Sequence, residues 1–143
     1  MPRRLRRLLV ALAPALLLPT LLAAQSSGLS DDEYLKLGHQ YYAWFVGGEA
    51  DSLFAHLAPG VAEQAGGLEG IHSAIFDFLG RAGDETELLE EKMTRRLGHP
   101  QYWHKAKYAL FTSEPIVFRW VLDDEGRITG VGMGPESNAP KPD

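Results

Sequence analysis

The chain has 143 residues, no cysteine, and 14 lysines and arginines against 19 aspartates and glutamates, giving a formal net charge of −5. The absence of cysteine excludes disulfides and acylation at a cleavage-site cysteine. A chain of this length and acidity builds one hydrophobic core and repels nucleic-acid phosphates, so we expect a single domain with no nucleic-acid partner.

Residues 1–24 are predicted to be a secretory signal peptide. Four arginines among the first seven residues precede an apolar run at 8–22, and Ala23 and Ala24 provide a small-residue cleavage site. That run of 15 residues contains prolines and is shorter than the roughly 20 apolar residues of a membrane span. We expect cleavage after Ala24, export to the periplasm or the exterior, and no membrane span in the mature protein. The leader removes four arginines and no acid, which makes the mature net charge about −9.

Three helices are predicted after a polar linker at 25–29. Ser30, followed by Glu33 three residues later, is typical of a capping box, and Gly47 with Gly48 supplies the stop of the first helix. Apolar side chains recur at spacings of three and four in each predicted segment. The predicted helices cover residues 30–46, 49–57 and 68–79, and the second is expected to end at Pro59-Gly60.

Residues 85–97 have two interpretations that the sequence leaves open. Their composition favours a helix, but an expected turn at 97–100 and the aromatic-rich segment after it favour one strand of a hairpin. A further strand is predicted at 116–122. In it Trp120 shares a face with Phe118, while Arg119 belongs to the opposite face. The other predicted strands cover 101–111 and 127–133. Residues 136–143 are expected to form a disordered, solvated tail.

Helices followed by an antiparallel meander predict an α+β fold. The order and lengths of the segments, and the ending PIVFRWVLDDEGRITGVGMGP, resemble the NTF2-like, ketosteroid-isomerase-like superfamily. The chain is most similar to the uncharacterised domain that precedes serine β-lactamase-like hydrolases in exported bacterial proteins. This resemblance covers residues 30–135. It implies an NTF2-like cone, with three N-terminal helices packed on a curved antiparallel sheet, and a homodimer formed through the open sheet face.

Local motifs for catalysis are missing from the sequence. There is no S-x-x-K nucleophile, no metal-ligand spacing among the histidines, and no phosphate loop, because the glycines at 130, 132 and 134 lead into a tail instead of a helix. We therefore assign no catalytic residue, metal or cofactor, and expect these glycines to allow close approach of another backbone or chain.

A pocket inside the fold is the remaining place for chemistry. His104 is the most reactive candidate, as a base or a ligand contact, against the simpler interpretation of a histidine hydrogen-bonded within the sheet. Asp77 is expected to point outward from its helix. The candidate pocket residues are Tyr42, Tyr102, His104, Tyr108 and Trp120.

The function expected from these observations is that of an exported, non-catalytic binding or protein-interaction module, whose partner is a small apolar ligand or an envelope protein. Two alternatives remain open. One is a small-molecule isomerase or lyase of the ketosteroid-isomerase type that uses His104 or a tyrosine, and the other is a regulatory partner of a separate serine hydrolase.

Overall fold

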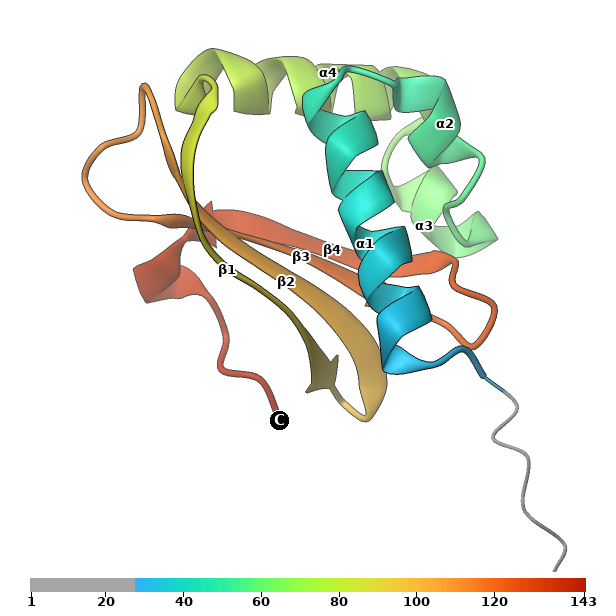
Figure 1. Ribbon diagram of the computed structural model, residues 1–143. Coiled ribbons are helices and arrows are strands. Elements are labelled where there is room, and N and C mark those ends of the chain that lie inside the picture. The colour runs from blue at the N-terminus through green and yellow to red at the C-terminus, as the bar shows by residue number, and fades with distance from the viewer. Residues whose placement is uncertain (1–27) are drawn as a thin grey trace, which may run out of the picture.

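The computed structural model describes residues 28–143, so the expected signal peptide and most of the expected linker lie outside the described residues. Within this range, helices come first and a four-stranded antiparallel sheet follows, which confirms the α+β prediction (Figure 1). None of the helices in this range combines the length and the hydropathy needed to cross a membrane. The elements are α1 (Asp31–Val46), α2 (Ala50–Phe54), α3 (Pro59–Gln64), α4 (Gly67–Ala82), β1 (Glu85–Arg96), β2 (His99–Tyr108), β3 (Ile116–Leu122) and β4 (Ile128–Pro135).

Helix α1 begins at the predicted capping box. The Ser30 side chain accepts a hydrogen bond from the Glu33 N–H, and Glu33 Oε2 accepts one from the Ser30 N–H at 2.8 Å. The helix then lies directly against the sheet: a Cβ added at Gly38 would come within 2.3 Å of Tyr102 Cγ. A glycine at this position therefore sets the close approach of α1 to β2.

The helical region differs from the prediction of three helices, because the described part of the chain contains four. The second helix, α2, is shorter than predicted, and Pro59, where that helix was expected to end, instead begins α3. A proline suits the first turn of a helix, since it lacks only an N–H that would have no intrahelical partner there. The predicted third helix corresponds to α4, which extends beyond the predicted 68–79 at both ends.

The ambiguous segment at 85–97 is the strand β1. It pairs antiparallel with β2 across a tight turn in which Leu97 and Gly98 both have positive φ, 51° and 79°. Pairing with β2 outweighs the helix propensity of the glutamates and leucines, as tertiary context commonly does. The strand order is β1-β2-β3-β4, with His104 of β2 opposite both Glu91 of β1 and Phe118 of β3.

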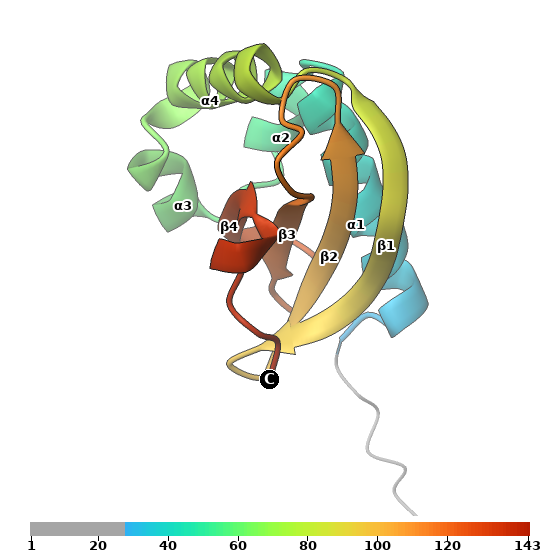
Figure 2. The same ribbon diagram turned by 90° about the vertical axis from the view of Figure 1, so that its left-hand side faces the viewer.

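The sheet is curved, and its concave face holds the helices (Figures 1 and 2). The predicted faces of β3 are confirmed, because Phe118 and Trp120 lie in the core with α1 and are 0% and 2% exposed. Trp103 and Arg119 are on the opposite, convex face, at paired positions of β2 and β3.

The segment expected to be a solvated tail starts with a short 3-10 helix, η1 (Glu136–Asn138). The Glu136 N–H donates to the Pro115 carbonyl at 2.9 Å, and at the far end of the segment the Asp143 N–H donates to the Arg95 carbonyl at 3.2 Å. Asp143 Oδ2 also accepts from the Gly98 N–H at 3.0 Å. The C-terminal segment therefore crosses beside the sheet from the start of β3 to the β1–β2 turn (Figure 2).

Candidate functional site

Four of the five candidate pocket residues meet in one hydrogen-bonded cluster between α1 and the concave face of the sheet. Tyr42 from α1 donates to Glu85 Oε2 at 2.5 Å, and its hydroxyl lies 2.6 Å from the hydroxyl of Tyr108. His104 Nε2 lies 2.8 Å from the same Glu85 oxygen. One carboxylate oxygen of β1 thus joins a helix residue to a residue of β2.

A second carboxylate completes this cluster on the other side of the imidazole. Tyr102 donates to Glu91 Oε1 at 2.5 Å, and its hydroxyl lies 3.1 Å from His104 Nδ1. Glu91 Oε1 is also 2.8 Å from Nδ1 of His39, an exposed residue of α1. We call this cluster the Tyr–Glu–His network, and its members are Tyr42, Glu85, Glu91, Tyr102, His104 and Tyr108.

The electrostatics of the network favour protonated phenols and an ionised Glu91. Burial raises the pKa of Tyr42 and of Tyr102, and their hydrogen bonds to carboxylates raise it further. Burial likewise raises the pKa of Tyr108 to about 12. For Glu91, burial acts to raise the pKa, but the hydrogen bonds from Tyr102 and His39 outweigh it and hold the pKa below its usual value. The tyrosines are therefore donors at neutral pH.

His104 is closed off inside this network. It is 3% exposed, both ring nitrogens have partners, and its ring stacks on that of Tyr42 with centroids 3.8 Å apart. A general base must come within about 2.6–3.2 Å of a substrate proton. The pockets described below are lined by none of Tyr42, Tyr102 and His104. The geometry thus suits a structural role, in which the hydrogen bonds of the network hold α1 against the sheet.

Sequence reasoning brought together four members of the network but missed Glu85 and Glu91. Both lie on the segment whose secondary structure was ambiguous, so the faces of that segment were unassigned. Once β1 is paired with β2, the register places Glu91 opposite His104 and Glu85 opposite Tyr108. For Glu91 the missing signal was therefore the pairing, because uninterrupted register from the turn places it opposite His104. Glu85 comes opposite Tyr108 only through two register shifts in β1, which the sequence does not indicate.

The fifth candidate, Trp120, lies apart from the network. The centroid of its ring lies 4.8 Å from that of Phe118 and 6.1 Å from that of Phe45. Its Nε1 has no hydrogen-bond partner among the described residues. Asp77 is exposed on α4, as expected.

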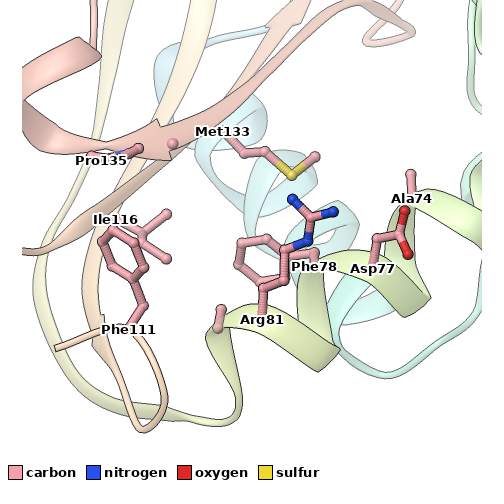
Figure 3. Close-up of a pocket in the computed structure, with 10 residues that line it drawn as sticks. Ala74, Asp77, Phe78, Arg81, Phe111, Ile116, Met133 and Pro135 are labelled. Atoms are coloured by element: carbon pink, nitrogen blue, oxygen red, sulfur yellow. The ribbon is translucent and has the colours of Figure 1, made fainter.

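An apolar groove runs between α4 and the edge of the sheet formed by β4. Its larger part is a pocket of about 400 Å³, with Asp77 and Arg81 on the α4 wall and Met133 and Pro135 on the opposite wall (Figure 3). A smaller pocket of about 140 Å³ adjoins it, sharing Ala74 and Met133. We call the two together the α4–β4 groove. Further lining residues are Phe45, Leu53, Leu57, Ala65, Ile71, Phe78, Ala82, Phe111, Ile116, Trp120, Val131 and Gly134.

The groove offers apolar contact with few polar groups. Val131 and Met133 of β4 are 45% and 38% exposed although they are apolar, and they face the groove from its sheet side. Asp77 and Arg81 are the charged side chains that line it. Within residues 28–143, no three His, Cys, Asp or Glu side chains are grouped so that they could hold a metal ion.

Comparison of the chain with protein-family models, with curated proteins and with solved structures finds no match.

Proposed function

We propose that the protein is a non-catalytic binding module that takes a small apolar ligand in the α4–β4 groove. The observation that carries this proposal is the separation of the two sites. The side chains capable of acid–base chemistry are bonded to one another in the Tyr–Glu–His network, whereas the open cavity is lined almost entirely by apolar groups.

The size of the groove supports this proposal. Small-molecule sites are concave, mostly apolar, and about 300–1,000 Å³ in volume, with a few polar groups that orient the ligand. The larger pocket, at about 400 Å³, falls in this range, and Arg81 and Asp77 supply polar groups at its margin. An apolar ligand that filled both pockets of the groove would cover Val131 and Met133, whose exposure costs free energy in water.

The wider setting is part of the same proposal. We infer an NTF2-like cone from the sequence resemblance together with an α+β arrangement in which helices occupy the concave face of the sheet. Export is inferred from the order of basic, apolar and small residues in 1–24, and an intact mass beginning near Gln25 would support it. The homodimer through the sheet face remains a prediction that sedimentation can test.

Binding of an apolar fluorescent probe, 8-anilinonaphthalene-1-sulfonate, to the purified mature protein tests the groove. Ala74 lines both pockets, so Ala74→Trp should fill the space between them and weaken probe binding at least tenfold. Ser73→Trp is the matched control, because Ser73 is the exposed neighbour on α4 and lines neither pocket. Equal probe binding by the wild type and both variants would show that the groove is not the site.

A catalytic role is the second candidate, and Tyr108 is the residue that favours it. Tyr108 borders a pocket of about 320 Å³ beside the loop after β2, and its hydroxyl is hydrogen-bonded within the network. A tyrosine so placed could donate a proton to an enolate. Turnover of an enolisable ketone that disappears in Tyr108→Phe and His104→Gln, with the melting temperature unchanged, would establish an isomerase and replace the binding proposal.

A further inference from the structure

The convex face of the sheet carries a second cluster that neither the groove nor the Tyr–Glu–His network uses. Trp103, Arg119 and Gly132 stand in one row across β2, β3 and β4. Arg119 forms no hydrogen bond or salt bridge within residues 28–143, and its Nε is buried without a partner. Trp103 is 7% exposed, and its Nε1 is likewise a buried donor without a partner. Two neighbouring N–H donors on this face therefore have no acceptor.

The backbone around Arg119 is shaped to receive its guanidinium. A Cβ added at Gly132 would lie 2.1 Å from Arg119 Nη2 and 2.6 Å from Cζ, so the arginine occupies the space that the glycine leaves. A small pocket of about 40 Å³ lies beside it, with Val117 on one side and Asn138 and Ala139 of the C-terminal segment on the other. A space of this volume exceeds what one water molecule requires.

No acid of residues 28–143 forms a salt bridge with Arg119, and two acids of this part of the fold pair with lysines instead. Glu136, just after β4, is bound to Lys105 at 3.0 Å. Glu90 of β1 is bound to Lys92 at 2.6 Å and lies 3.6 Å from Lys105. Arg119 is half-buried. Burial lowers the pKa of its guanidinium, and the positive charge of Arg96 lowers it further, so the site is partly desolvated and positive. Such a charge is unfavourable unless an anion reaches it.

We propose that Arg119 and the small pocket beside it form a binding site for a small carboxylate on the convex face of the sheet. The planar guanidinium matches the two oxygens of a carboxylate. Trp103 pairs with Arg119 across β2 and β3 and does not line the pocket, so its indole N–H serves as a nearby reporter of binding. Gln101 Oε1, a third unpartnered buried atom of this face, is an acceptor and takes no part in binding the anion. This site goes beyond the proposed function, because its donor is on the convex face of the sheet. The pocket beside Arg119 and the apolar groove share Met133, Gly134 and Pro135 of the edge strand β4.

Nuclear magnetic resonance of the ¹⁵N-labelled mature protein tests the site directly. Titration with sodium acetate should shift the Trp103 indole N–H and the Arg119 Nε–H resonances in a saturable manner, while sodium chloride at the same ionic strength should not. Arg119→Gln should weaken the Trp103 response at least tenfold. Arg95→Gln is the matched control, because Arg95 is a surface arginine paired with Asp31, and it should respond as the wild type does.

A second variant keeps the proposal open to refutation if Arg119→Gln folds poorly. Gly132→Ala should displace the flexible guanidinium and also weaken the response to acetate. Equal shifts with chloride and acetate, or an undiminished response in Arg119→Gln, would overturn the proposal. It would also be overturned if acetate had no effect while Arg119→Gln dissociated a homodimer, since a carboxylate of a second copy would then be the natural partner.

Discussion

Replacement of Trp120 by alanine provides a quantitative test of the core. Trp120 is 2% exposed and packs against Phe45, Phe118 and Tyr41, and removal of a buried tryptophan side chain typically costs about 3–5 kcal/mol. Its Nε1 has no partner among the described residues, and an unsatisfied buried donor costs about 1–3 kcal/mol in the native state. Alanine removes that penalty along with the ring, so we expect a net loss below the usual range, about 2 kcal/mol.

Phenylalanine at the same position separates the two contributions. Trp120→Phe keeps an aromatic ring in the core and removes the unpartnered N–H, so its free energy of unfolding should stay within about 1 kcal/mol of the wild-type value. Urea denaturation followed by the fluorescence of Trp44 and Trp103 measures both variants. A loss below about 1 kcal/mol for Trp120→Ala would show that the indole is not packed, and equal losses for both variants would refute the account of the N–H.

Three further variants test helix packing and the ionisation of Glu91. Gly38→Ala should destabilise the fold by about 1–3 kcal/mol, because the added Cβ would lie 2.3 Å from Tyr102 Cγ. Gly80→Ala adds a Cβ with no atom within 4 Å and should stabilise α4 by about 0.5–1 kcal/mol. Thermal or urea denaturation measures both changes. The native state holds the pKa of Glu91 below its ordinary value of 4.5. The stability that this carboxylate contributes is therefore present above pH 4.5 and is lost as the pH falls through the lowered pKa of the folded state. Glu91→Gln should therefore make the free energy of unfolding less sensitive to acid, and an unchanged acid profile would contradict the role of the Tyr102 and His39 hydrogen bonds.

The parts of the fold that sequence reasoning predicted are those encoded by near neighbours. The capping box at Ser30 joins residues three apart, and the faces of β3 follow from strict alternation, so both were evident without knowledge of the tertiary structure. The sequence pattern predicts that a helix ends at Pro59, although proline is equally suited to begin one. The choice between these depends on where the following segment packs, which local sequence does not specify.

The candidate sites depended more strongly on distant contacts. His104 and the tyrosines could be placed on shared faces, but the partner carboxylates come from β1, whose strand identity required the pairing with β2. The α4–β4 groove is formed by elements more than 40 residues apart, and no local periodicity indicates such a space. At Gly132 the expectation was close approach of another backbone or chain, whereas the structure places the side chain of Arg119 there.

The sharing of one Glu85 oxygen by Tyr42 and His104 has a consequence for how the sequence can change over time. A helix and two strands meet at this atom. Without Tyr42 the buried Tyr108 hydroxyl loses its hydrogen-bond partner, and without Glu85 the buried His104 Nε2 loses its own. Single substitutions here should be purged more strongly than the simultaneous replacement of Tyr42, Glu85 and His104 by apolar residues of similar volume. Descendants of this sequence should accordingly keep the trio intact or lose it together, which would appear as covariation between positions 42, 85 and 104.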